Sequence, residues 1–289
     1  MVLRFLICLS FIPLAGAETP VQHQLELKLH HHLKELDDRT HGVLGIATID
    51  LTSGRVYVYN GDVVFPTAST IKIPILATMF RANVKLDEQL TIEPKDTVGG
   101  SGRLQNELKN GPVNLNVRQL MTAMIQYSDN TATNRCIRIA GMENVNKMLA
   151  SFGFRATRLR RIMLDTAAAT RGDENTTTPL EMARIVELLY RNKLTPAPQT
   201  ADMLSMLKLV NADIRKVIPA NIEVASKPGD LTGVHCETAI VYLPGRPFIL
   251  SVYSSFLDEN TNPVPEVAHL VFEYFRKLAE SNQYGNKIK

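Results

Sequence analysis

The sequence predicts an α/β (α+β) protein in which an antiparallel sheet, built from both ends of the chain, packs with helices and carries an inserted all-helical lobe. Two strand-like segments follow an amphipathic segment near the N-terminus, and three strand-like segments and a helical one close the chain. Between them the hydrophobic pattern is mostly helical. Because the 289 residues contain no repeat and no polar linker, we expect a single domain over residues 18–289 with two lobes.

The first part of the sheet lobe is predicted within residues 18–66. Thr19-Pro20 has the chemistry of a helix start, and leucines from Leu25 to Leu36 follow it at spacings that suit one buried face. Strand-like segments at 43–51 and 55–59 are joined by the turn Thr52-Ser53-Gly54, which indicates a hairpin.

The helical lobe is predicted over about residues 67–211. Its best-marked helix start is Thr178-Pro179-Leu180-Glu181, with threonine as the cap, proline at the first position and glutamate at the third. The sheet lobe resumes at about residue 212. Its three strands and final helix are expected at 222–227, 238–243, 248–255 and 265–279.

Three short groups carry the chemistry: Ser69-Thr70-Ile71-Lys72, Ser128-Asp129-Asn130 and Lys227-Pro228-Gly229. A helix over 67–81 would put the Lys72 amine on the same face as the Ser69 hydroxyl, which needs a neighbour to take its proton. Lys72 can do so if burial or nearby cations lower its pKa. Each group alone has an ordinary structural reading as a cap, a turn or a solvated lysine. Their order and separation together predict a site built on a nucleophilic serine.

This set of motifs resembles that of class A β-lactamases and penicillin-binding serine hydrolases, whose third motif is Lys-Thr-Gly. The stretch Tyr127 to Asn134 resembles the family's second motif and its surroundings. Thr157-Arg158-Leu159 and Thr176-Thr177-Thr178-Pro179 resemble the two edges of its Ω-loop. The resemblance runs from about Leu25 to the C-terminal helix, and it implies a β-lactamase/transpeptidase-like fold.

The resemblance implies a role for each matching residue. Ser69 would attack the β-lactam carbonyl to give an acyl-enzyme, and Ser128 would pass a proton to the leaving nitrogen. Lys72 would act as the base for Ser69, or would supply charge that keeps the protons of the site mobile. The substrate-binding residues would be Asn130 for the side-chain amide, Lys227 for the carboxylate, and Gly229 and Asp230 for the oxyanion. The oxyanion donors implied are the backbone N–H groups of Ser69 and Asp230.

One departure from the family lies in the Ω-loop. Met163 stands where the family has the glutamate that activates the hydrolytic water, and a thioether cannot accept that proton. Asp165 is the candidate base for deacylation, or else an acceptor that structures the loop; Asp173 and Glu174 are weaker substitutes. Asn175 stands where the family has an aspartate, so we expect a weakened ion pair with Arg161. We therefore expect slow deacylation unless Asp165 serves as the base.

The other departure is Pro228, where the family has threonine or serine. Its ring removes both a hydroxyl donor for the substrate carboxylate and a backbone N–H, which suits an edge strand that lines a cleft. Thr232 or His235 could supply the missing contact. The alternative for His235 is a surface histidine outside the site.

Residues 1–17 have the pattern of a signal peptide: Arg4, an apolar run from Phe5 to Leu14, and the small residues Ala15-Gly16-Ala17. The apolar run is too short for a membrane anchor. We expect a periplasmic or secreted monomer that begins near Glu18 and has no membrane anchor.

Two cysteines remain in that chain, Cys136 and Cys236. An oxidising compartment permits a disulfide, but the first belongs to a helix and the second lies beside a strand, so we expect two free, buried thiols. His30-His31-His32 cannot converge on one ion from a regular helix. The net charge of +3 gives no basic stripe for nucleic acid. The sequence predicts no metal site, no cofactor and no nucleic-acid partner.

Three functions remain open from the sequence. The first is a β-lactamase that opens the lactam amide. The second is a penicillin-binding protein, or a D-alanyl-D-alanine peptidase acting on peptidoglycan-like peptides, that is acylated without efficient turnover. The third is a β-lactam-binding module without hydrolysis. The missing glutamate favours the last two, whereas the matches around the motifs favour the first.

Overall fold

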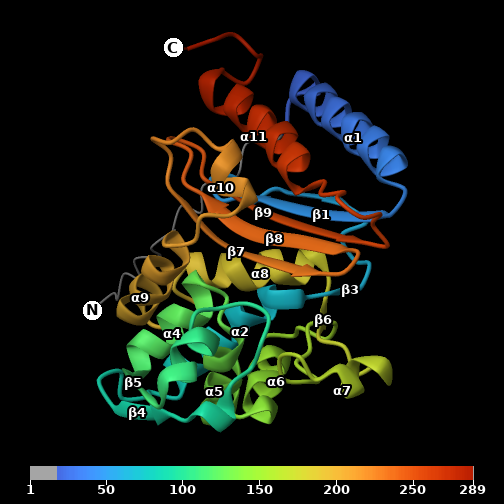
Figure 1. Cartoon of the computed structure of the whole chain (residues 1–289). Helices are drawn as coiled ribbons and strands as arrows, with labels where there is room; N and C mark the ends of the chain where they lie inside the picture. The colour runs from blue at the N-terminus through green and yellow to red at the C-terminus, as the bar shows by residue number, and fades with distance from the viewer. Residues whose placement is uncertain (1–17, 289) are drawn as a thin grey trace, which may run out of the picture.

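A five-stranded antiparallel sheet forms the frame of the structure, a computed structural model that describes residues 18–288 (Figure 1). The strand order is β2-β1-β9-β8-β7. The strands are β1 (Val43–Asp50), β2 (Val56–Tyr59), β7 (Val224–Leu231), β8 (Val234–Val241) and β9 (Phe248–Ser255). The N-terminal hairpin joins the C-terminal strands through the β1–β9 pair, so the prediction of a sheet built from both chain ends is confirmed. The predicted signal peptide, residues 1–17, lies outside the described residues.

The predicted bounds of two strands are wrong. β9 has the expected range, but β7 continues past Lys227 to Leu231 and β8 begins at Val234, so the two form a hairpin through Thr232-Gly233. Gly233 has a φ of +71°, which glycine adopts without strain. Pro228 lies within β7, which is tolerated because β7 is an edge strand of the sheet.

Helices cover both faces of the sheet (Figure 1). The helices α1 (Pro20–Thr40) and α11 (Val264–Glu280) lie side by side on one face, and α8 (Pro179–Tyr190) lies on the other. Phe248 of β9 stacks on Phe275 of α11 with ring centroids 4.2 Å apart, which anchors the first layer. α1 buries Leu29, Leu33 and Leu36, whereas Leu27 is 46% exposed and lies off the predicted face.

Local capping chemistry explains where these helices begin. Thr19 forms a capping box with Gln22 before α1, and the Thr178 hydroxyl accepts the Glu181 N–H at the start of α8. Both helix starts were predicted. The Glu181 carboxylate accepts backbone N–H groups of residues 155–157, which ties α8 to the chain before the Ω-loop.

The remaining elements form the helical part of the molecule between β3 and β7 (Figure 1). Its helices are α2 (Lys72–Arg81), α3 (Leu104–Glu107), α4 (Val117–Gln126), α5 (Asn130–Ala140), α6 (Met142–Ser151), α7 (Thr166–Thr170), α9 (Ala197–Lys208) and α10 (Asp213–Val217). Two small sheets pair β3 (Phe65–Pro66) with β6 (Thr176–Thr177) and β4 (Gln89–Ile92) with β5 (Val113–Asn116). α8 belongs to this segment in sequence but packs on the main sheet. The predicted division of the domain into two lobes therefore remains a prediction.

α2 is the central helix of that part, and every residue from Lys72 to Phe80 is buried. A 3₁₀ turn, η1 (Ala68–Ile71), precedes it, so the helix expected over 67–81 begins as a tighter turn. Both thiols are free and buried, as predicted; Cys136 lies in α5 and Cys236 in β8. Across residues 18–288, no helix combines the length and the apolar character needed to span a membrane.

Glu237 of β8 is a buried carboxyl group beneath the start of α10. It is 1% exposed, and one of its oxygens accepts the Ile214 N–H at 3.0 Å. The other oxygen has no hydrogen-bond partner within residues 18–288. Burial raises the pKa of this carboxyl group to about 7.

We expect Glu237→Gln to stabilise the protein at alkaline pH. The carboxyl ionises near pH 4.5 when unfolded and at about 7 when folded, so the stability that it contributes in acid is lost as the pH rises between these values. A shift of that size corresponds to about 3 kcal/mol at most. Glutamine removes the charge and keeps the acceptor for Ile214.

Thermal unfolding of wild type and variant at about pH 5 and about pH 8.5 measures the effect. These two pH values lie on either side of the pKa of the folded carboxyl group, so its contribution to stability differs between them. The Tm of the variant should exceed that of wild type chiefly at the higher pH. An equal difference at both pH values would contradict the buried, ionising carboxyl group.

Candidate active site

The three motif groups meet where the edge strand β7 faces the starts of α2 and α5. The Ser128 hydroxyl oxygen accepts from two ammonium groups, Lys72 Nζ at 2.9 Å and Lys227 Nζ at 3.1 Å. Asn130 Oδ1 lies 3.1 Å from Lys72 Nζ. Residues from three distant parts of the sequence therefore form one hydrogen-bonded cluster.

Both lysine side chains are completely buried. Their other partners are the carbonyl oxygens of Ser128 for Lys72 and of Pro228 for Lys227, at 2.7 and 3.0 Å. In the part of the chain that the structure describes, neither ammonium has a carboxylate oxygen within 4.0 Å. Burial, followed by the charge of Lys227, holds the pKa of Lys72 well below its ordinary value. Burial lowers the pKa of Lys227 to about 8.

Ser69 lies in the η1 turn directly before α2. The Lys72 N–H donates to the Ser69 carbonyl, and this i to i+3 turn aligns the two side chains. Ser69 is partly exposed and lines a hollow of about 190 Å³ together with Asn130 and Asp230. Within residues 18–288 its hydroxyl makes no hydrogen bond, so the oxygen is available to a ligand. Ala68, which precedes it, has a φ of +42°.

Gly229 brings strand β7 against the turn that holds Ser69. A Cβ at Gly229 would lie 2.6 Å from the Ser69 nitrogen, so only glycine permits this approach. Pro228 lies opposite Glu237 of β8. Proline has no backbone N–H, so it fits a strand position at which the N–H of any other residue would point away from β8. Asp230, two residues on, has the same orientation, so its N–H faces the open edge beside Ser69.

The second motif is fixed by side-chain contacts with backbone. Asp129 Oδ1 accepts the Ala132 N–H at 2.9 Å, and its Oδ2 accepts the Leu104 N–H at 2.8 Å. Asn130 Nδ2 donates to the Gly99 carbonyl at 3.0 Å. Ser128 has a φ of +53°, a strained backbone that these contacts hold in place. Asp129 is therefore occupied with backbone donors and does not pair with Lys72.

The Ω-loop presents apolar side chains to the hollow. Met163 is 8% exposed, lines the hollow and is held by Asn134, whose amide bonds both the N–H and the carbonyl of Met163. Asp165 Oδ1 accepts the Ala168 N–H at 2.9 Å and so caps α7. Asp165 is not among the residues that line the hollow. The role of Asp165 as the deacylation base stays a prediction. The contact seen here, with the Ala168 N–H, is the loop-structuring one that the sequence left as the alternative.

The neck of the Ω-loop differs from expectation. A weakened ion pair between Arg161 and residue 175 was expected. Arg161 instead forms an ion pair with Glu174, the residue before it, at 2.7 Å. Asn175 is 2% exposed, and its Oδ1 accepts the N–H groups of Arg160 and Arg161 at 2.7 and 3.0 Å. Its Nδ2 donates to the Arg161 carbonyl at 3.1 Å. The sequence signal that could have predicted the Arg161–Glu174 ion pair is the carboxylate directly before Asn175.

The two candidates for the missing carboxylate contact do not line the Ser69 hollow, although each is next to a residue that does. Thr232 is exposed in the β7–β8 turn and lines a different, mainly apolar hollow with Phe256. His235 Nδ1 lies 2.6 Å from Asp230 Oδ1. Neither residue lines the hollow at Ser69, and their substrate-binding role stays a prediction. Leu164 does line it, although no sequence signal marked that residue.

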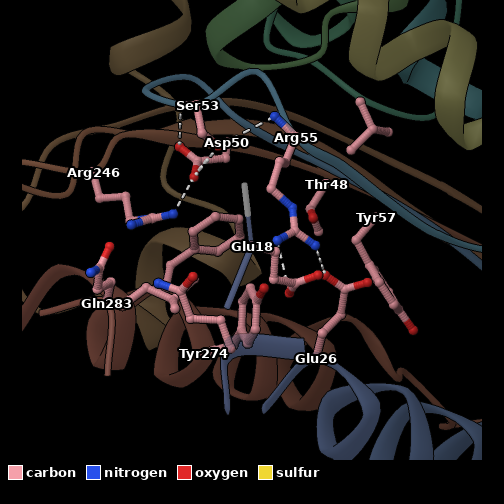
Figure 2. A pocket seen from close by; sticks show the side chains of 14 residues that line it. Glu18, Glu26, Thr48, Asp50, Ser53, Arg55, Tyr57, Arg246, Tyr274 and Gln283 are labelled. Carbon is pink, nitrogen blue, oxygen red and sulfur yellow. Dashed lines mark hydrogen bonds and ion pairs between the residues drawn. The ribbon is translucent and has the colours of Figure 1, made fainter. Parts of the chain in front are cut away.

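A second polar hollow, of about 210 Å³, lies between α1, the β1–β2 hairpin and α11 (Figure 2). Figure 2 shows its charges facing one another across the cavity. Arg55 pairs with Glu18 and Glu26 at 2.7 and 2.6 Å, and Arg246 pairs with Asp50 at 2.7 Å. The Arg55 pairs tie α1 and the residues before it to the hairpin, and the Arg246 pair ties the β8–β9 connection to β1. The motif residues do not line this hollow.

The fold, the Lys72–Ser128–Lys227 cluster and the serine at the start of α2 together define a serine hydrolase of the acyl-enzyme type. The model of the "Beta-lactamase enzyme family" matches residues 28–275. The chain belongs to this family, as a class A member.

Relatives and solved structures agree with that assignment. The chain is 30% identical to β-lactamase AST-1 of Nocardia asteroides over 79% of its length and 76% of the relative. It is 28% identical to β-lactamase ROB-1 of Haemophilus influenzae over 89% and 88%. An ancestral class A β-lactamase structure matches with a TM-score of 0.78 and 29% identity, covering 86% of this chain and 100% of the other. A β-lactamase from Sphaerobacter thermophilus gives a TM-score of 0.75 and 27% identity over 86% and 94%.

We expect Asn175→Ala to loosen the Ω-loop, because it removes three buried hydrogen bonds to the backbone of residues 160 and 161. Leaving these backbone groups without partners should cost about 2–4 kcal/mol. Hydrogen exchange of residues 158–175 should accelerate relative to the rest of the chain. The matched variant Asn175→Asp keeps both acceptor contacts and should change less. Equal exchange in wild type and Asn175→Ala would contradict this account of the neck.

Proposed function

We propose that the protein hydrolyses β-lactams through an acyl-enzyme on Ser69. The observation that carries the proposal is the Ser128 hydroxyl shared by two buried lysines, one of which also bonds Asn130, a residue that lines the hollow with Ser69. Buried ammonium groups without a carboxylate partner favour loss of one proton, which makes a base available at neutral pH. The relatives carry the name β-lactamase, which supports the substrate class.

In the proposed acylation step, the neutral Lys72 amine takes the Ser69 proton as Ser69 Oγ bonds to the lactam carbonyl carbon. The carbonyl electron pair moves to its oxygen, which the N–H groups of Ser69 and Asp230 would stabilise. The oxyanion then reforms the carbonyl and the C–N bond breaks. The nitrogen takes the Ser128 proton, and Lys72 returns its proton to Ser128 through their 2.9 Å contact.

The proposed substrate contacts use the remaining motif residues. Lys227, held by the Ser128 hydroxyl and the Pro228 carbonyl, would attract the substrate carboxylate. Asn130 would bond the side-chain amide of the substrate. Thr232 or His235 would replace the hydroxyl missing at Pro228. We further propose a monomeric protein exported to the periplasm or the exterior, which rests on the pattern of residues 1–17.

We propose that deacylation is the slow step. Met163 cannot take a proton from water, and the Asp165 carboxylate would have to leave its cap on α7 to do so. Slow deacylation would also suit a penicillin-binding protein that stays acylated. The relatives favour the hydrolase, because those named above are called β-lactamases.

Mass spectrometry after brief exposure to benzylpenicillin tests this function directly. We expect a covalent adduct of the intact penicillin mass that forms and then disappears, and no adduct in Ser69→Ala. If Asp165 is the base, Asp165→Asn should prolong the adduct while leaving its formation unchanged. An adduct that never decays would indicate a penicillin-binding protein. Penicillin that is consumed while the wild-type protein stays free would still mean hydrolysis, whereas wild type that forms no adduct and leaves the penicillin intact would contradict the proposal.

The pH dependence of kcat/KM tests the charge of Lys227. Its pKa of about 8 means that the ammonium is present below that pH and lost above it. For an anionic penicillin we expect kcat/KM to fall about tenfold per pH unit on the alkaline side. Lys227→Arg, which keeps its charge, should move the decline to higher pH. A profile without an alkaline decline in wild type would exclude this role.

A further inference from the structure

A mainly apolar hollow of about 330 Å³ lies between the start of α1, the end of α11 and the tail that follows α11, residues 281–288. Val21, Leu25 and Leu278 supply its apolar side chains, and none of the motif residues lines it. Hollows of about 300 Å³ and more, apolar and with a few polar groups, are typical of sites for small molecules. The size and the lining of this hollow therefore suit a ligand of low molecular weight.

Hydrogen bonds hold the tail that forms one wall of the hollow. Thr19 Oγ1 donates to the Gln283 carbonyl at 2.7 Å, which ties the tail to the start of α1. The Ile288 N–H donates to the Glu280 carbonyl at 2.9 Å, which ties the other end of the tail to α11. Two helices and a folded-back segment thus enclose the hollow, so it is more than a gap beside a loose segment.

The charged side chains that line the hollow are all positive. Lys28 of α1, Lys277 of α11 and Lys287 of the tail line it, and no aspartate or glutamate of the described chain does so. Within residues 18–288, none of these three ammonium groups has a carboxylate oxygen within 4.0 Å. Three ammonium groups without a direct counter-charge attract an anion to the hollow.

The acidic residues nearest in sequence to the lining residues make their ion pairs with arginines. Arg55 binds two glutamates on the α1 side. Arg276 of α11 binds Glu273 and Glu280 at 2.7 and 2.6 Å. Because these carboxylates are engaged elsewhere and do not line the hollow, the three lysines remain available to a ligand.

We propose that the hollow binds an anionic amphiphile, with one apolar chain against Val21, Leu25 and Leu278 and a carboxylate or phosphate head group among the three lysines. Lysine suits this role because its ammonium is a compact charge on a long apolar stem, which can lie along the chain of the ligand. The hollow shares no residue with that of Ser69, so the proposal does not depend on β-lactam hydrolysis.

Titration with decanoate, kept below the concentration at which it forms micelles, tests the proposal. The amide NMR signals of the isotope-labelled protein should shift saturably, chiefly in residues 21–28 and 277–287, and the shifts give the Kd. Acetate lacks the chain, and decyltrimethylammonium carries the opposite charge on the same chain. Each should bind at least about tenfold more weakly than decanoate, because burial of the chain and attraction of the head group both contribute.

The charge variant combines Lys28→Gln, Lys277→Gln and Lys287→Gln. It should raise the Kd for decanoate about tenfold, the scale that three exposed ion pairs support. Changing the same three lysines to arginine keeps the charge and should leave the Kd within about twofold of wild type. All three side chains are exposed, so equal Tm values should show that the variants fold.

The matched control combines Lys85→Gln, Lys95→Gln and Lys193→Gln. These lysines are exposed too but do not line the hollow, so the Kd should not change. Val21→Asn, which removes an apolar contact and no charge, should weaken the binding of decanoate and leave that of acetate unchanged.

Several outcomes would overturn the proposal. Wild type without a saturable shift would do so, as would decyltrimethylammonium that binds as tightly as decanoate. An equal rise of the Kd in the control variant would mean that only the net charge matters. Sedimentation with phosphatidylglycerol vesicles separates a free amphiphile from a membrane. Protein that sediments with the vesicles but does not bind decanoate would recognise a membrane surface, which also rejects the site for a single amphiphile.

Discussion

Two fully buried lysines that share one serine hydroxyl, with no carboxylate within reach in the described chain, are the constraint on which the site depends. Burying two ammonium groups side by side is unfavourable unless neutral oxygens satisfy their protons and one of them gives up its charge. Lys72 has three such oxygens, and its pKa is well below the ordinary value. The same burial that makes the cluster costly therefore favours the neutral amine at Lys72.

The scaffold around this cluster keeps it in place. Ala68, Ser128 and Leu164 all have left-handed backbone, a conformation that costs about 1–3 kcal/mol per residue when it is not glycine. Each belongs to a segment held by neighbours: the turn before the buried helix α2, the Asp129 cap of α5, and the Asn134 contacts with the Ω-loop. Three of the residues with left-handed backbone therefore lie in segments that form the site, and contacts with neighbouring elements hold each of them.

The Ω-loop is closed at its neck although Met163 stands where the family has a glutamate. Asn175 and the Arg161–Glu174 pair close the neck of the loop with backbone and ionic contacts. Inside the loop, Met163 and Leu164 make an apolar wall toward Ser69. The loop therefore has structural support that does not require a carboxylate facing the hollow.

The sequence alone determined the fold class, the meeting of both chain ends in one sheet, the starts of α1 and α8, and the identity of Ser69, Lys72, Ser128, Asn130 and Lys227 as one set. These features depend on local capping, on hydrophobic period and on motif order, all of which are written in neighbouring residues. Pro228 likewise predicted the edge strand, because its missing N–H is a local property.

Only the tertiary structure decided what depends on contacts between distant segments. The extension of β7 and β8 follows from their pairing, which overrides the break that Pro228-Gly229 suggests. The ion pair of Arg161 with Glu174 and the place of Thr232 in a hollow other than that of Ser69 both depend on how loops lie against one another. No local pattern encodes such contacts, because their energies exist only after the sheet and α2 have brought the loops together.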